Sequence, residues 1–237
     1  MRRLILGLAA ASLAIAIVGC GGSGNGIVNV PNPRVRVANL MPNIPNAKSQ
    51  VGSDTIGGAS GIDFGTVSDY AITNNGNKDL SVGDSTFNNL ATLSNQLFET
   101  QKRYTGIAYG TAPRTILLLD EDKNSASGGS VSLQTINAAQ GQGAFDVYVT
   151  DSTGSGTLPA TPSFPNIGVG IISSFADVPA AGGPLSARIR VYATGQTTTA
   201  LVDKTVLLDS QERAAIVVYA DPSAGSGLNV IVLKENI

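Results

Sequence analysis

The sequence predicts an all-β protein: two tandem Ig-like antiparallel β-sandwich domains that follow a signal peptide and a flexible tether. Glycine accounts for 28 of 237 residues and charged residues for only 14%, a composition that favours strands and turns. Short apolar segments are separated by turn clusters along most of the chain. Several motifs also occur twice in the same order, which indicates an internal repeat.

The first element is a secretory signal, residues 1–19. Two arginines precede an uncharged, mostly apolar run, Leu4–Val18, which is shorter than the roughly 20 residues that span a bilayer. This run leads into Ile17–Cys20, which resembles the lipobox of bacterial lipoproteins, whose cysteine is lipidated and becomes the first mature residue. A membrane helix and an ordinary signal peptide are the alternatives, but neither explains the position of Cys20, the only cysteine in the chain.

The lipobox resemblance implies a location. Stable anchoring needs more than one acyl chain, and the resemblance implies a diacylated or triacylated Cys20, with palmitate among the chains. We therefore expect a lipid-anchored protein of the cell envelope whose partner is the bilayer. Gly21 follows the cysteine, which in a diderm host resembles the default that is forwarded to the outer membrane.

Charge excludes one class of partner. Two arginines leave with the signal, so the formal net charge changes from −2 to about −4. A mildly acidic chain without a basic region does not attract nucleic acid.

Residues 20–33 form the lipidated N-terminus and tether. Glycine and serine make the first part flexible, and the prolines stiffen its end. At ~3.3–3.6 Å per residue, the segment after the cysteine reaches at most about 45 Å.

The strands begin at Arg34–Val37, where charged and apolar residues alternate as in a half-buried strand. Seven further segments are rich in β-branched and aromatic residues and are bounded by turn residues. These segments are Ile116–Leu119, Val131–Ile136, Phe145–Thr150, Arg188–Tyr192, Thr205–Leu208, Ile216–Tyr219 and Leu228–Leu233.

The repeat defines the domains. Three segments of the first copy recur in the second: Val35–Asn39 as Leu133–Asn137, Phe64–Tyr70 as Val169–Phe175, and Leu97–Arg103 as Leu207–Arg213. We therefore expect one β-sandwich over residues 34–123, a linker over 124–130 and a second β-sandwich over 131–237, each near the size of a small sandwich domain. Ser152–Pro165, rich in Gly, Ser, Thr and Pro, is expected to be an insertion of the second copy and a contact surface.

One segment has two interpretations. Phe87, Leu90, Leu93 and Leu97 are spaced like one face of a helix. Their counterpart in the second copy, Leu201–Leu208, is typical of a strand, and two copies should share one fold. We therefore predict a strand here.

The motifs together resemble the domain-of-unknown-function family forty-three ninety-seven, which occurs as tandem repeats in bacterial exported and surface proteins. The resemblance rests on Arg34–Asn43, Phe64–Tyr70, Tyr104–Gly110 and, in the second copy, Phe145–Val149. These are strand and turn motifs, so the resemblance implies a fold and a location and transfers no catalytic residue.

The sequence contains few motifs that could carry catalysis. The chain has no histidine, which excludes Ser-His-Asp and Cys-His catalysis and the usual zinc sites. Its one cysteine is assigned to lipid, and neither a nucleophile elbow nor a phosphate-binding loop occurs. We therefore expect no enzyme and no cofactor.

Carboxylates remain as candidates. Asp120, Asp122 and Asn124 space oxygen ligands two residues apart, as a calcium loop begins, but Gly and Glu are missing later in the motif. The alternative for Asp120–Asp122 is a solvated acidic turn. Four aspartates near strand ends could pair in a hydrolase, with solvation or turn bonding as the alternative: Asp146, Asp151, Asp203 and Asp209.

Six tyrosines and six phenylalanines occur without tryptophan, and the tyrosines lie mostly within predicted strands. We expect them to pack in the core or on sheet faces, with a sugar-stacking platform as the alternative. The sequence thus favours a non-enzymatic membrane-anchored envelope lipoprotein, a structural or protein-interaction module whose partner is an envelope protein or glycan. The alternative is a carbohydrate- or calcium-dependent binding module at the cell surface.

Overall fold

The computed structural model of the protein describes residues 31–121, 126–154, 156–180 and 183–235. These residues form seventeen strands and no helix, which confirms the all-β prediction. The first half contains β1 (Arg34–Leu40), β2 (Lys48–Val51), β3 (Asp54–Ile56), β4 (Thr66–Val67), β5 (Ala71–Ile72), β6 (Gly76–Gly83), β7 (Asn89–Phe98), β8 (Arg103–Tyr109) and β9 (Thr115–Asp120). The second half contains β10 (Ser130–Ala138), β11 (Phe145–Asp151), β12 (Phe164–Ile167), β13 (Ala176–Pro179), β14 (Leu185–Ala193), β15 (Val202–Leu208), β16 (Arg213–Ala220) and β17 (Leu228–Glu235).

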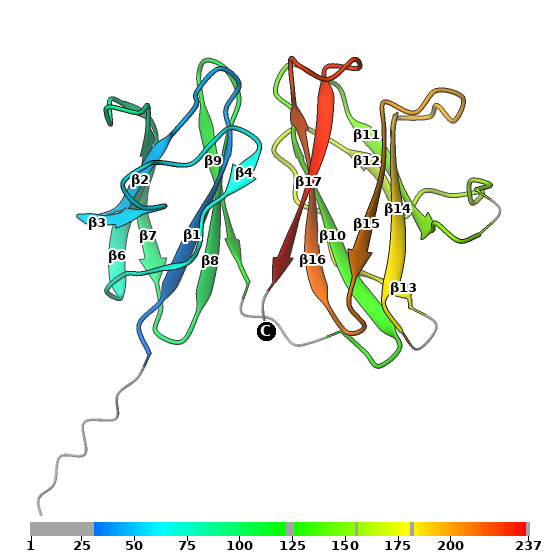
Figure 1. The fold of residues 1–237 in the computed structure, drawn as a ribbon, viewed down its shortest axis with the longest axis horizontal. Coiled ribbons are helices and arrows are strands. Elements are labelled where there is room, and N and C mark those ends of the chain that lie inside the picture. Colours follow the sequence, from blue (N-terminus) through cyan, green and yellow to red (C-terminus); the bar gives the residue numbers. More distant parts are fainter. Residues whose placement is uncertain (1–30, 122–125, 155, 181–182, 236–237) are drawn as a thin grey trace, which may run out of the picture.

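Each half is a sandwich of two sheets (Figure 1). In the first half the sheets have the strand orders β4-β1-β8-β9, with β5 also paired to β1, and β3-β2-β6-β7. In the second half the orders are β13-β10-β16-β17 and β12-β11-β14-β15. The pairing pattern recurs in detail, since β1 runs parallel to β8 and β10 parallel to β16, while the other ladders are antiparallel.

The eight segments predicted as strands all lie within strands, and the contested segment Phe87–Leu97 lies mainly in β7. The strand interpretation of that segment is therefore confirmed. The turn before β7 contains Phe87 itself, so the helical spacing of the leucines reflects no helix. The predicted linker also differs slightly, because β10 begins one residue earlier, at Ser130.

The half-buried character predicted for Arg34–Val37 is wrong. From Val35 onward every residue of β1 is buried, and so is every residue of β10. The reason is that the sheets containing β1 and β10 are covered on both faces. Strands covered on both faces have near-continuous apolar sequences, such as the run from Ala214 to Tyr219 in β16.

One face of each of these two sheets packs on the partner sheet of its own sandwich, and the other face is covered by the other half of the molecule. Between the two sandwiches lies a third apolar cluster, which we call the seam, formed where the sheet of β1, β8 and β9 faces the sheet of β10, β16 and β17 (Figure 1). Its buried members are Ala38, Leu40, Ile107, Tyr109 and Leu119 from the first half and Ile136, Ala138, Ala215, Val217, Tyr219 and Leu233 from the second. The four sheets are therefore stacked face to face around three cores.

Two glycines allow the halves to approach closely at the seam. A Cβ atom on Gly65 would lie 3.0 Å from the Tyr219 hydroxyl, and one on Gly170 would lie 3.3 Å from the Tyr109 hydroxyl. Both glycines have a φ of +76°, which other residues rarely adopt. Phe64 adds an edge-to-face contact with Tyr219 at 5.7 Å between ring centroids. Motifs that recur in the sequence therefore build the contact between the halves.

Candidate functional site

The densest group of charges is buried at one end of the seam. Arg36 on β1 donates from Nη2 to Glu121 Oε1 at 2.7 Å and from Nε to Thr105 Oγ1 at 2.7 Å. Thr105 and Tyr70 in turn donate their hydroxyl hydrogens to Glu121. Arg36 and Glu121 are each only 6% exposed. The solvated turn expected for Glu121 is therefore wrong, because β1, β8 and the segment before β5 bring a cation and two hydroxyl donors to its carboxylate.

The second half contributes a similar arrangement. Arg213 lies 3.4 Å from Glu235 Oε2, and its guanidinium group lies 3.7 Å from the centre of the Phe175 ring. Burial and the nearby charge of Glu121 raise the pKa of Glu235 to about 7. Arg36 also crosses the seam, donating to the backbone oxygen of Lys234 at 2.8 Å. The bond from Arg36 therefore joins the halves, while Glu235 Oε1 is buried without a hydrogen-bond partner among the described residues.

Tyr70 belongs to the same cluster. Burial, followed by its hydrogen bond to Glu121, raises the pKa of its hydroxyl. Its ring lies 4.7 Å from the guanidinium carbon of Arg36, within the range of a cation–π contact. The hydroxyl therefore serves as a donor to a buried carboxylate.

The metal candidates are not brought together in the part of the chain that can be described. The Asp120 carboxylate lies 3.2 Å from the Lys102 ammonium group. Asp122 and Asn124 lie outside the described residues, as does Cys20 with the predicted lipid attachment. Within the described ranges, no three His, Cys, Asp or Glu side chains are close enough to share a metal ion.

The four aspartates near strand ends have structural contacts. Asp146, 7% exposed, accepts hydrogen bonds from the backbone N–H groups of Asn166 and Gly195 at 2.7 and 2.8 Å. These bonds attach β12 and the turn after β14 to β11, so Asp146 is not solvated and instead bonds to a turn. The remaining contacts are Asp151 with Thr153, Asp203 with Arg188, and the backbone N–H of Asp209 with Glu212.

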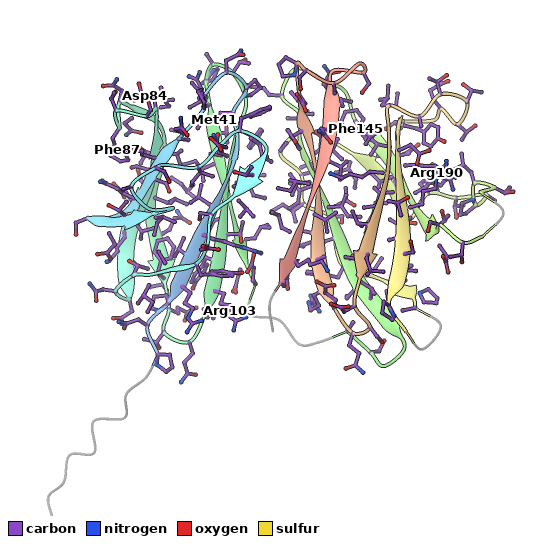
Figure 2. The ribbon with its side chains drawn as sticks, in the orientation of Figure 1. Met41, Asp84, Phe87, Arg103, Phe145 and Arg190 are labelled. Atoms are coloured by element: carbon purple, nitrogen blue, oxygen red, sulfur yellow. The ribbon has the colours of Figure 1, made fainter. Side chains whose placement is uncertain are left out.

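The segment Ser152–Pro165 is anchored to the sandwich. The buried Arg190 donates to the Gly156 backbone oxygen at 2.5 Å, and Phe164 begins β12 with only 3% of its surface exposed. The end of this segment is therefore part of the second core. Figure 2 shows Arg190 on the side of the second half that faces away from the seam.

The tyrosines pack as expected. Five of the six are at most 5% exposed: Tyr104, Tyr109, Tyr148, Tyr192 and Tyr219. The packing interpretation is confirmed for these five.

A surface hollow lies on the sheet of β3, β2, β6 and β7. It has a volume of about 580 Å³, and its lining combines one aromatic ring with neutral polar groups and one lysine. The lining residues are Lys48, Ser49, Gln50, Thr55, Gly58, Ala59 and Phe87.

The loop that carries Phe87 is held by Asp84 (Figure 2). Asp84 Oδ1 accepts from the backbone N–H groups of Thr86 and Asn88 at 2.8 and 3.0 Å, and the Phe87 N–H donates to the Asp84 backbone oxygen at 2.9 Å. Hydrogen bonds from Asn88 and Thr86 lower the pKa of this carboxyl group. Phe87 itself has a φ of +64°, a strained conformation for an aromatic residue. Sequence reasoning missed this site, although the pattern Asp-Ser-Thr is typical of an Asx turn.

Within the described ranges, the chain forms no helix that could span a bilayer. No curated protein matches the chain. Among solved structures, one match is the C-terminal domain of AlgF from P. aeruginosa, with 15% identity, a TM-score of 0.24, and coverage of 46% of this chain and 99% of that one. A second is the family CBM26 module of Amy13K from Eubacterium rectale, solved with maltoheptaose, with 13% identity, a TM-score of 0.26, and coverage of 85% of this chain and 96% of that one.

A protein-family model matches the first half of the chain and the start of the second half. The model of the family described as "Domain of unknown function (DUF4397)" matches residues 33–148, from the residue before β1 into β11. The resemblance predicted from the strand motifs is thereby confirmed for residues 33–148.

Proposed function

We propose that the protein is a non-enzymatic, lipid-anchored module of the cell envelope that acts as a structural or protein-interaction element. The observation that carries this proposal is the buried cluster around Arg36 and Glu121. Catalytic acids and bases need perturbed pKa values and access to substrate. Here Arg36 and Glu121 bind each other within the first half, and Arg36 also donates to the Lys234 backbone oxygen across the seam, so their role is to fix one half against the other.

The seam supports the interaction role. A stack of four sheets with a shared apolar core holds its surface loops in a fixed arrangement, which lowers the entropy that binding would cost. The lipobox-like sequence Ile17–Cys20 supports the proposed location. β1 begins at Arg34, so a lipid on Cys20 would hold the sandwich by a short tether.

The experiment has two parts. Cells grown with radiolabelled palmitate should label the wild-type protein and not the Cys20→Ala variant, and equal labelling of both would refute the anchor. Mild crosslinking of native envelope, followed by purification, should recover a specific partner with the wild type. The Cys20→Ala variant, released from the membrane, should recover less of that partner.

One observation favours a second candidate, a carbohydrate-binding module. The hollow beside Phe87 offers an aromatic ring and neutral hydrogen-bonding groups on an open sheet face.

A further inference from the structure

We propose that the outer face of the sheet β3-β2-β6-β7 binds a neutral polysaccharide chain. This assignment rests on the non-enzymatic binding role proposed above and names a class of ligand for it. The site consists of the hollow and of the polar row beside it, defined next.

The polar row crosses four strands in register. Thr55 on β3 is paired with Gln50 on β2, Gln50 with Ser81 on β6, and Ser81 with Thr92 on β7. Cross-strand partners share a face of the sheet, so these four side chains form one line of hydroxyl and amide groups. Among the described residues, the side chains of Gln50 and Thr55 make no hydrogen bond and are available to a ligand.

A second row of cross-strand partners, next to the polar row, positions the aromatic ring of the hollow. Lys48 on β2 is paired with Gly83 on β6, and Gly83 with Asn89 on β7. A Cβ atom on Gly83 would lie 2.6 Å from the Asn88 backbone oxygen, so the glycine lets the loop after β6 fold closely onto the sheet. That loop carries Phe87, which lines the hollow.

The conformation of Phe87 indicates a use for its ring. Positive φ in a large side chain is costly and persists where the surroundings impose it, often at binding sites. The hydrogen bonds to Asp84 impose it here. Asx turns usually carry glycine or asparagine at such positions, so the aromatic side chain is not required by the turn.

The chemistry matches a sugar chain. A sugar ring has an apolar face that packs on an aromatic ring and hydroxyl groups at its edge that hydrogen-bond to amide and hydroxyl side chains. Lys48 is the single charged residue in the lining, which provides little attraction for an anionic polymer. A protein partner would require a larger group of apolar anchors than one phenylalanine. A neutral polysaccharide lying along the polar row meets these conditions.

The test uses the full mature chain with Cys20→Ala, analysed by affinity electrophoresis in gels that contain one polysaccharide each. The neutral probes are starch, xyloglucan, mixed-linkage β-glucan and hydroxyethylcellulose, and alginate is the anionic probe. We expect at least one neutral probe to retard the protein. Phe87→Gly should weaken that retardation at least tenfold, because it removes the ring while suiting the positive φ.

Controls separate binding from folding. Leu97→Ala, on the same sheet but outside the hollow, should leave the retardation unchanged. Phe87→Gly should keep the thermal unfolding midpoint of the parent, and Gln50→Ala should reduce retardation severalfold.

Three results would overturn the inference: no retardation by any neutral probe, retardation by alginate alone, or retardation that Phe87→Gly leaves intact. Release of new reducing ends from a probe would instead overturn the non-enzymatic function. The two failures can therefore be told apart.

Discussion

Replacement of Glu235 by glutamine should make the protein more stable at alkaline pH and remove part of its pH dependence. Glu235 ends β17 with only 4% of its surface exposed, facing Arg213 of its own half and Glu121 and Arg36 of the other. Burial, the largest cause, raises its pKa from 4.5 to about 7, and the charge of Glu121 adds to this effect. Ionisation of this side chain therefore opposes folding.

The size of the stability difference follows from the shift in the pKa of Glu235. Between pH 4.5 and 7 the folded protein holds a proton on Glu235 that the unfolded chain has released. The stability from this group is thus fully present below pH 4.5 and is lost as the pH rises through 7. A shift of roughly 2.5 pKa units corresponds to about 3 kcal/mol. Glutamine stays neutral, so the free energy of unfolding of Glu235→Gln should exceed that of the wild type by up to about 3 kcal/mol at pH 8. The two free energies should match near pH 4.5.

Urea unfolding at pH 4.5, 6 and 8 would measure this difference directly. Glu99→Gln is the matched control, because the Glu99 side chain is half exposed and pairs with Lys102 at the surface. It should show no comparable gain at pH 8. Parallel stability curves for the wild type and Glu235→Gln over this range would refute the reasoning.

Three further substitutions test the seam and the loop contacts by urea unfolding. Gly65→Ala should lower the free energy of unfolding by about 1–2 kcal/mol more than Gly195→Ala, because both glycines have positive φ but only the first faces the Tyr219 hydroxyl. Equal losses for the two variants would mean that the seam relaxes around the added methyl group. Arg36→Met should cost about 3–5 kcal/mol, since it leaves a buried carboxylate without its cation, and a loss below 1 kcal/mol would contradict the burial of the cluster. Asn137→Ala should cost about 2–3 kcal/mol, because its side chain bonds two backbone oxygens and one N–H, and an unchanged midpoint would show that water replaces them.

The sequence predicts the long strands well because their signal is local. Ile216–Tyr219 and Leu228–Leu233 are rich in β-branched residues, and each lies within an observed strand. The internal repeat added information that one short segment of sequence does not contain, because two copies of a repeat should share one fold. It identified the segment before Phe98 as a strand by comparison with the more regular Leu201–Leu208.

The seam could not be predicted, because an apolar pattern shows which residues avoid water and not which surface covers them. Arg36 is an example: in sequence it marks the exposed side of a strand, yet in the structure it is buried. Its partner Glu121 lies 85 residues away, and nothing near either residue in the sequence indicates the other.

The hollow escaped prediction for a different reason. It depends on β2 and β3, which have four and three residues, too few for a periodic pattern. Its aromatic residue lies in a turn where Phe87 could be counted with the leucines of the next strand. Short elements such as these are positioned by their neighbours in the sheet.

The contact between the halves has a consequence for how such chains can grow. The same face of each half forms the seam, and the contacts are exchanged: Gly65 meets Tyr219 while Gly170 meets Tyr109. Such an isologous arrangement, with an approximate two-fold axis, uses up the surface that creates it. A third unit joined to this chain would find no free face of that kind. A longer chain would therefore have to add repeats two at a time. Each pair of repeats would form its own seam and unfold as one cooperative unit.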